Sequence, residues 1–398
     1  MQSTEKRVLS ITCLGHALSH VYILIFATAL IALRNEFQVS LTQITRIGTL
    51  SYLVYGLGAF PSGILAARTN AKFTLRLFYL LSGLAAALIG LTDSLALFTA
   101  GLILLGLAGS LYHVSGLTLI SHVMEKRGRA MGLHGVAGSA GIALTPALTG
   151  LIISALGWRE AYLILAAPGL AGFLFLLLDR TIPQAHVEMH ESASQKRGML
   201  PIHVILVAAG VMCVNGLIYR GFMTMLPTYI SENVRIAGFS GVVTGGVFST
   251  VILSVGMIGQ FTGGHLSDRM SMIRLYLAAV ALTLPFMLLI GFTENMSLVV
   301  AALLFALFHF PQQPIENHLI AHLIPPRLVS WGYGIKFTLT FGVGSFAAGL
   351  AGLVADNQGL SSVFLALAGL IVLSALLIAL LIPKEKEILD TEESGSAV

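Results

Sequence analysis

Three ionisable side chains lie inside long apolar runs of the chain: Arg220, Glu316 and Lys336. A charge at the centre of a bilayer costs about 2.5–3.5 kcal/mol on insertion scales, so each is a candidate functional residue. Two cations against one acid favour an anionic ligand, held by bidentate hydrogen bonds from Arg220 and by a second point charge from Lys336. Pairing of Arg220 with Glu316, or snorkelling of Lys336 to the interface, is the structural alternative.

The segment 308–317 interrupts an apolar run with two prolines and several polar groups: His309, Pro311, Gln312, Gln313, Pro314, Glu316 and Asn317. A proline removes a backbone donor, and such a break survives at membrane depth only beside protein or a water-filled cavity. His309, Gln313 and Glu316 can share one helix face. We predict that Glu316 carries protons, because a shielded acid can exchange protons near neutral pH. A hydrogen-bond network between helices is the alternative.

Four histidines occupy apolar runs of the first half of the chain: His16, His20, His113 and His134. Because the unperturbed imidazole titrates near about pH 6.5, we predict proton-coupling roles for His16 and His309. His20 and His113 are predicted to contact the substrate. Histidine is also a common ligand of transition metals. No intramembrane Asp, Cys pair or Met cluster accompanies these residues, so the sequence predicts no metal site.

Two further polar residues, Asn215 and Tyr219, lie four positions apart and next to Arg220. They are predicted to bind substrate beside Arg220, as are Gln312 and Gln313; polar packing between helices is the alternative reading of Asn215 and Tyr219. Arg220 aligns with His20 at an offset of 200 residues, so both halves of the chain place a basic group at one equivalent position.

The composition indicates which elements position these residues. The chain has 398 residues, 56% of them hydrophobic and 10% charged, with a mean hydropathy of +0.89. Soluble proteins carry about 25% charged residues, and a helix needs about 20 apolar residues to cross a bilayer. We therefore predict an all-α membrane protein with twelve transmembrane helices in two pseudo-symmetric bundles. The predicted spans are 8–33, 47–67, 74–92, 95–123, 130–156, 160–178, 203–231, 241–266, 275–293, 296–325, 332–355 and 360–383.

The Lys and Arg residues of the connectors predict the orientation. One side holds most of them, whereas the other holds Arg34, Arg46, Arg159 and Arg235. Both termini and the 179–201 connector are therefore expected in the cytoplasm of a bacterial inner membrane. The pI near 9.1 then reflects topology and not nucleic-acid binding. We expect a monomer whose partners are lipid, protons and a small anionic molecule.

An internal repeat divides the chain into halves. Leu119-Ile-Ser-His122 recurs as Leu319-Ile-Ala-His322, and Cys13 matches Cys213. Residues 1–178 and 202–398 would then be two like-oriented six-helix bundles joined by a cytoplasmic linker, the pattern of parallel-repeat transporters.

Two motifs carry a family resemblance. Gly264-His-Leu-Ser-Asp268-Arg269 resembles the signature loop of the major facilitator superfamily, and its counterpart keeps Gly63 and Arg68 but has Ala67 in place of an acid. Helix five resembles the antiporter motif of that superfamily at Gly138, Gly141, Pro146 and Gly150. The resemblance implies conformational gating by Gly264, Asp268, Arg269 and Arg68. No GxxxxGK[ST] pattern is present, so neither ATP drive nor a cofactor is expected.

A narrower resemblance concerns His16-Ala-Leu-Ser-His20 and Gly109-Ser-Leu-Tyr-His113, which are similar to motifs of the fosmidomycin-resistance family, although His20 stands where that family has an acid. That family exports a phosphonate drug by exchange with protons. The resemblance implies a secondary transporter for proton-coupled export of a small organic anion or drug. Uptake of a carboxylate is the first alternative; a transition-metal or metal-chelate transporter, a membrane-embedded enzyme and a receptor rank below it.

Overall fold

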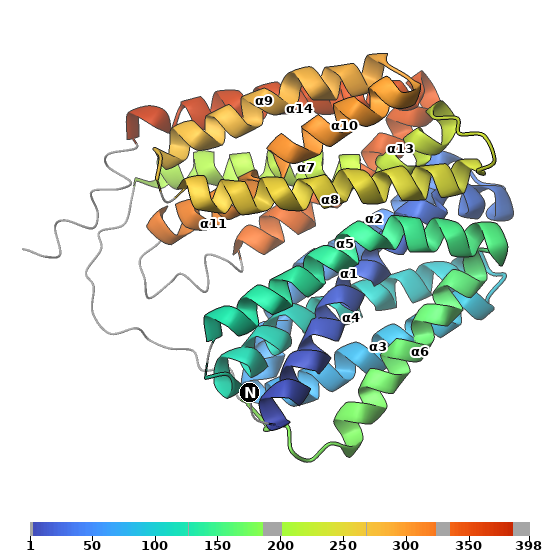
Figure 1. Cartoon of the computed structure of the whole chain (residues 1–398), viewed down its shortest axis with the longest axis vertical. Helices are drawn as coiled ribbons and strands as arrows, with labels where there is room; N and C mark the ends of the chain where they lie inside the picture. The colour runs from blue at the N-terminus through green and yellow to red at the C-terminus, as the bar shows by residue number, and fades with distance from the viewer. Residues whose placement is uncertain (1–2, 126, 186–200, 268, 324–334, 385–398) are drawn as a thin grey trace, which may run out of the picture.

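Twelve helical spans long and apolar enough to cross a membrane follow one another along the chain. The computed structural model describes residues 3–125, 127–185, 201–267, 269–323 and 335–384. Each predicted span overlaps one of these helices, which confirms the all-α membrane fold. Figure 1 shows the first half of the chain below and the second half above, with the helices of both halves running across the view.

The first half consists of six helices in the order α1 (Ser3–Phe37), α2 (Leu41–Arg68), α3 (Ala71–Leu91), α4 (Leu95–Val123), α5 (Arg127–Ala155) and α6 (Trp158–Leu178). Within it, α1 packs against α4 and α5, α2 against α4, and α3 against α6. Helices α1, α2 and α5 also reach the second half, so they are the elements of this half that can present side chains between the halves.

The second half consists of α7 (Ile202–Asn233), α8 (Gly241–Ser267), α9 (Met272–Phe292), α10 (Asn295–His309), α11 (Gln312–Leu323), a π-helical segment η2 (Thr338–Val343), α13 (Phe346–Gln358), α14 (Leu360–Ala379) and a short 3-10 turn η3 (Ile382–Lys384). Helix α6 ends at Leu178 and α7 begins at Ile202, and residues 186–200 lie outside the described residues. The linker boundaries at 179 and 201 stay a prediction.

Helix α2 begins at Leu41, six residues before the predicted start at 47. Ser40 caps it: the Ser40 hydroxyl accepts from the Gln43 N–H at 3.1 Å, and the Gln43 side chain accepts from the Ser40 N–H at 2.8 Å. This reciprocal capping box satisfies two backbone donors that the first turn leaves free. Hydropathy alone misses such a polar first turn, which is the reason for the difference.

The tenth span is broken where the prolines predicted a break. Helix α10 ends at His309 and α11 begins at Gln312, so Pro311 falls in the interruption. In the eleventh span the chain adopts a π-helix at Thr338–Val343, which the sequence did not predict. A π-helical turn inserts an extra residue and frequently marks a functional site. Both irregular segments lie next to the ionisable residues Glu316 and Lys336.

The two halves meet at one end of the molecule, at the right of Figure 1. There the Asp356 carboxylate of α13 accepts from the N–H of Leu41 at 3.2 Å, the N–H of Thr42 at 2.7 Å and the Thr42 hydroxyl at 2.6 Å. It therefore caps the start of α2 across the interface, where a negative charge is stabilised by the helix dipole. At the left of the figure the helices of the two halves diverge.

Helices α5 and α8 also cross at the joined end. A Cβ atom on Gly246 would lie 2.3 Å from the Pro146 carbonyl oxygen, and one on Gly150 would lie 2.7 Å from that of Val242. The Ala147 N–H donates to the Thr250 hydroxyl at 3.0 Å. Pro146 and Gly150 of the predicted antiporter motif thus form a contact between backbones of opposite halves, whereas Gly138 and Gly141 face α1 of their own half.

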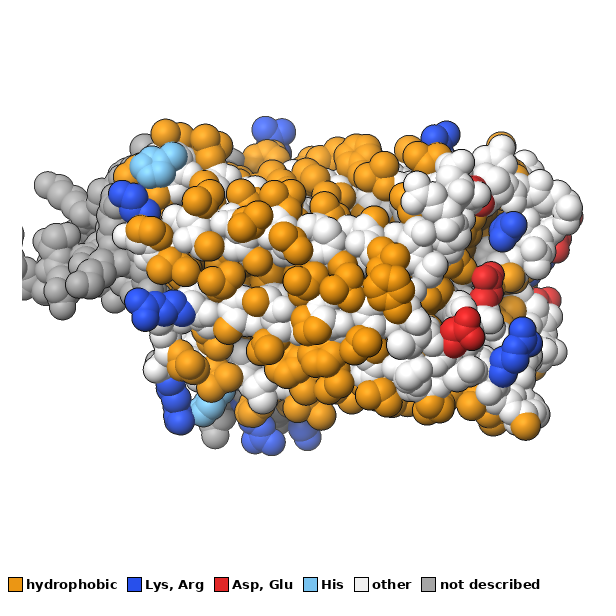
Figure 2. All heavy atoms as spheres, turned by 90° about the horizontal axis from the view of Figure 1, so that it is seen from above, with side chains coloured by type: hydrophobic (Ala, Val, Ile, Leu, Met, Phe, Trp, Pro, Cys, Tyr) orange, Lys and Arg blue, Asp and Glu red, His pale blue; other side chains and the backbone are white. Residues whose placement is uncertain are grey.

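The surface carries a broad apolar band. Figure 2 shows hydrophobic side chains across the middle of one face, with Lys, Arg and His at the left end and acidic side chains among Lys and Arg at the right end. Leu91, Leu178 and Phe292 are all more than 70% exposed. Such extensive exposed apolar surface suits lipid and not water. The chain is an integral multi-pass membrane protein, and its orientation stays a prediction.

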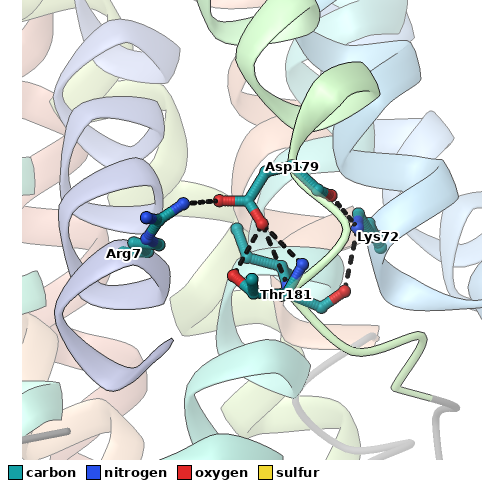
Figure 3. Close-up of polar contacts among 5 residues, drawn as sticks. Arg7, Lys72, Asp179 and Thr181 are labelled. Carbon is teal, nitrogen blue, oxygen red and sulfur yellow. Dashed lines mark hydrogen bonds and ion pairs between the residues drawn. The ribbon is translucent and has the colours of Figure 1, made fainter. Parts of the chain in front are cut away.

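A polar cluster ties three helices of the first half together (Figure 3). The buried Asp179 carboxylate, which follows α6, pairs with Arg7 of α1 at 2.8 Å and accepts from the hydroxyl and N–H of Thr181. Lys72 of α3 donates to the carbonyl oxygens of Asp179 and Ile182 at 2.6 and 2.8 Å. The cluster anchors the first residues after α6 to the start of α1 and α3.

Candidate functional site

A cavity of about 640 Å³ lies between the two halves. Its walls come from α1, α2 and α5 of the first half and from α7, α8, α10, α11 and residues 336–341 of the second. Every residue predicted to bind substrate or couple protons lines this cavity, except His113, which lies behind His16 and His20. Residues far apart in the sequence therefore meet at one central site.

Arg220 of α7 is the cation of this cavity that lacks a carboxylate partner. It is only 4% exposed, and its Cζ atom lies 4.0 Å above the Tyr52 ring of α2 and 6.0 Å from that of Tyr219. A cation over an aromatic face is stabilised by the ring quadrupole. Within the described ranges no acid forms an ion pair with Arg220, and its Nε atom has no hydrogen-bond partner. The alternative pairing with Glu316 is therefore not what the structure contains.

Glu316 instead pairs with Lys336. The Lys336 Nζ atom lies 3.2 Å from Glu316 Oε2 and donates to Asn317 Oδ1 at 2.7 Å. Glu316 is 5% exposed and Lys336 3%, so neither reaches the interface by snorkelling. A buried ion pair is stable only when further hydrogen bonds satisfy its atoms.

The second carboxylate oxygen of Glu316 is satisfied by two neighbours. Oε1 accepts from Asn215 Nδ2 at 3.0 Å and from the Tyr276 hydroxyl. Asn215 Oδ1 in turn accepts from the Ser374 hydroxyl at 2.7 Å. These donors suit an ionised carboxylate, and Asn215 serves Glu316 directly. The network joins α7, α9, α11 and α14, so the alternative of a hydrogen-bond network between helices describes part of its role.

The histidines of the first half form a cluster in the facing wall. His16, His20 and His113 each offer a ring nitrogen within 4.8 Å of the other two. His16 stacks on His134 with ring centroids 4.1 Å apart, and its Nδ1 donates to the His134 carbonyl oxygen at 2.7 Å. A Cβ atom on Gly138 would lie 2.3 Å from His16 Cε1, so α5 needs glycine there for the ring to fit. The sequence argument against a metal site did not anticipate this proximity.

The remaining predicted residues complete the wall of the second half. His309 stacks between Tyr219 and Phe305, with ring centroids 6.3 and 4.9 Å away. Gln313 Oε1 accepts from Gln260 Nε2 at 2.8 Å, and Gln312 is 5% exposed. Aromatic rings thus flank His309, whereas the Gln260–Gln313 hydrogen bond is exposed.

Three of the residues predicted to gate the conformational change, Arg68, Gly264 and Arg269, do not line the cavity. Arg68 ends α2 and Arg269 follows α8, both with exposed side chains. Asp268 lies outside the described residues, so its predicted role has no structural counterpart here. A Cβ atom on Gly264 would lie 3.7 Å from Pro314, so this position has room for a side chain. A Cβ atom on the neighbouring Gly263 would lie only 2.5 Å from Pro311. The close helix contact is therefore made by Gly263.

Comparison with known proteins identifies the family. Residues 12–349 match the sequence pattern of the Major Facilitator Superfamily. The chain belongs to this superfamily. The superfamily members named below carry transporter names, which agrees with the expectation of a transporter. The finer resemblance to the fosmidomycin-resistance family stays a hypothesis.

Individual superfamily members are distant from this chain. The "Probable sulfoacetate transporter" of Cupriavidus necator is 23% identical over 67% of this chain and 65% of its own length. The "Nitrite extrusion protein" of Bacillus subtilis is 24% identical over 62% and 61%. Each match spans less than two thirds of the relative. The structure of a bacterial homologue of the human lysosomal transporter Spinster, inward-facing and unoccupied, superposes with a TM-score of 0.78 at 16% identity over 98% of this chain and 99% of that one. That likeness supports the superfamily fold alone.

Sequence reasoning missed several residues of this superfamily site. Tyr52 and Tyr55 of α2, Tyr276 of α9 and Ser374 of α14 all contact the predicted residues. Tyrosine and serine are common in membrane helices, so the residue type alone does not indicate a functional role. The Tyr52-x-x-Tyr55 spacing, which places both hydroxyls on one helix face, could have indicated Tyr52 and Tyr55 but not Tyr276 or Ser374.

Proposed function

We propose that this superfamily member is a proton-coupled carrier of a small organic anion, working by alternating access between its two halves. The observation that carries the proposal is Arg220, a buried guanidinium in the central cavity without a carboxylate partner in the described part of the chain. Burying an unpaired charge is costly, so the site is incomplete until an anion arrives. A carboxylate, sulfonate or phosphonate matches the planar fork of a guanidinium.

Lys336 supplies the second contact and the link to protons. An anion that reaches Arg220 enters the same cavity as Lys336, whose Nζ atom is held 3.2 Å from Glu316. When Lys336 turns to the anion, Glu316 loses its counter-charge in a shielded environment and gains affinity for a proton. Binding of the anion and protonation of Glu316 thus reinforce each other.

This reciprocity bears on the direction of coupling. The sequence predicts export by exchange with protons, which requires the anion and the proton to compete for the carrier. The Glu316–Lys336 pair favours co-transport instead, because the anion and the proton stabilise the same state. The geometry therefore supports co-transport, in which the anion and the proton move in the same direction. The motif resemblance supports proton exchange, in which they move in opposite directions. Alternating access is supported by contacts that join the halves at one end while the cavity lies between them.

The test is the pH inside proteoliposomes after addition of organic anions, including sulfonates, carboxylates and phosphonates, to the outside. Co-transport acidifies the lumen as anions enter, whereas exchange makes it alkaline. In Arg220→Gln we expect anion affinity to fall by at least about tenfold, because a hydrogen bond to a charged group contributes about 1.5–3 kcal/mol. In Glu316→Gln we expect proton movement to cease while anion binding persists.

Matched controls are Arg34→Gln and Glu232→Gln, which remove exposed charges outside the cavity. Both should behave as the unmodified chain. A response to cationic drugs alone, or a response to anions that survives in both cavity variants, would contradict the proposed function.

A further inference from the structure

The histidine cluster of the first half is not used by the proposed anion and proton chemistry. His16 and His20 lie on successive turns of α1, and His113 projects from α4 toward them, with ring centroids 5.3 Å from His16 and 5.6 Å from His20. His16 and His20 line the central cavity. Three neutral imidazoles that converge at the wall of a cavity are a ligand set for a borderline transition-metal ion.

We propose that His16, His20 and His113 form a binding site for a divalent late-transition-metal ion, such as Co²⁺, Ni²⁺ or Zn²⁺, on the cavity wall. The nitrogens lie within 4.8 Å of one another. Metal–nitrogen bonds of about 2.0–2.1 Å place the nitrogens of a tetrahedral site roughly 3.4 Å apart. The His16 ring is fixed by His134 and Gly138, so we expect rotation of the His20 side chain to bring the nitrogens closer together.

Hydrogen bonds orient two of the three rings. A carbonyl oxygen can only accept, so the 2.7 Å contact with the His134 carbonyl places the His16 proton on Nδ1 and leaves the lone pair of the neutral ring on Nε2. The Tyr55 hydroxyl holds His113 through Nε2 at 2.8 Å. Metal-binding histidines generally have their other ring nitrogen fixed in this way. His20 has no hydrogen-bond partner among the described residues, which leaves its ring free to complete the set.

Surrounding residues reinforce this arrangement. Gly138 is the position on α5 that admits the His16 ring, as its Cβ contact of 2.3 Å shows. The His134 ring stacks on His16 from the other side. The cluster is thus enclosed by α1, α4 and α5 on one side and open to the cavity on the other. A metal held by three imidazoles would keep its fourth position toward the cavity.

The charge of Arg220 bears on what that fourth position holds. Arg220 lines the same cavity as His16 and His20, so its charge weakens the binding of a bare dication without preventing it. An anion between the metal and Arg220 offsets the repulsion. The site therefore fits a metal together with an anionic ligand better than it fits the metal alone.

The test is titration of the purified chain, without a polyhistidine tag, with Co²⁺ by calorimetry and visible absorption. We expect one Co²⁺ per chain and a rise in unfolding temperature with Co²⁺ concentration. His16→Gln, His20→Gln and His113→Gln should each weaken binding by more than about tenfold. Tyr55→Phe should weaken it by about tenfold, as loss of an outer partner does.

The control is His203→Gln, which removes an exposed histidine of α7. This variant should bind Co²⁺ as tightly as the unmodified chain does. Absence of saturable binding in the folded chain would overturn the proposal. Binding that survives in the triple variant at 16, 20 and 113 would overturn it as well. The titration measures binding and not transport, so its result does not depend on the outcome of the proteoliposome test.

Discussion

Arg220 and Lys336 show how neighbours decide the role of a buried cation. Both are less than 5% exposed and line one cavity. Lys336 has Glu316 at 3.2 Å, whereas Arg220 has the face of Tyr52. A ring offers less stabilisation than a carboxylate, about 0.5–2 kcal/mol. The guanidinium is thus held in place while its Nε donor has no partner, which is the arrangement an anion site needs.

Asp179 allows a prediction at the same scale. Burial alone would raise the pKa of its carboxyl, but hydrogen bonds from Thr181, Arg7 and Ile182 lower that pKa well below its usual value. A depressed native pKa stabilises the fold above the unfolded pKa of about 3.9, and this stability is lost as the pH falls below it. Asp179→Asn should therefore lower the free energy of unfolding at pH 7 by about 1.5–3 kcal/mol.

Thermal unfolding in detergent at pH 7 and near pH 3 measures this effect. The difference in unfolding temperature between Asp179→Asn and the unmodified chain should be smaller at the lower pH. Asp93→Asn is the matched control, since Asp93 also pairs with an arginine but its side chain is 93% exposed. Exposed ion pairs contribute little, so that variant should unfold normally. An equal gap at both pH values would contradict the assigned hydrogen bonding.

Helix α5 shows how one element serves two purposes. At Gly138 it makes room for His16, and at Gly150 it meets the backbone of α8 in the other half. The same run of small residues therefore builds the histidine cluster and the contact between halves. A helix with larger side chains at these positions would be displaced from α1 and from α8.

A pair of alanine substitutions on α5 tests this packing. Gly138→Ala should destabilise the chain by about 1–3 kcal/mol, because the new Cβ atom would lie 2.3 Å from His16 Cε1. Gly135→Ala is the matched control: it lines the same cavity, but its Cβ atom would meet nothing within 4 Å. It should be neutral or stabilising by about 0.5–1 kcal/mol through helix propensity. Thermal unfolding in detergent compares the two, and equal tolerance would refute the packing argument.

At the scale of the whole molecule, two of the contacts that join the halves lie at one end. One is α5 against α8, and the other is α2 against α13, where Asp356 caps α2. Alternating access requires both to separate together. Glycines bring the backbones close at these contacts, and the charged side chain there, Asp356, is exposed and bonds to uncharged groups of Leu41 and Thr42. The contacts can therefore part without leaving a buried charge unpaired.

Gly246→Ala tests whether the two contacts act as one. Its Cβ atom would lie 2.3 Å from the Pro146 oxygen, so it should push α5 and α8 apart. If the halves move as rigid bodies, Thr45 at the other contact, which is fully buried, becomes accessible. A cysteine at Thr45, with Cys13 and Cys213 replaced by alanine, should then react several-fold faster with a maleimide.

Gly369→Ala on α14 is the control for this experiment, because a Cβ atom there would meet nothing within 4 Å. It should leave the reaction rate of the cysteine unchanged. Unchanged labelling in Gly246→Ala would show that the α5–α8 contact opens independently of α2 and α13.

The sequence by itself determined the spans, the break at Pro311 and most of the polar residues that line the cavity. Hydropathy and proline chemistry act locally, so they can be read from consecutive residues. Tertiary structure decided the partners: Glu316 with Lys336, Arg220 with Tyr52, and three histidines together. These pairs join helices that are distant in the chain, and their geometry depends on how the helices pack. For the same reason the π-helix at Thr338–Val343 and the close contact at Gly263 emerged only when the helices were assembled.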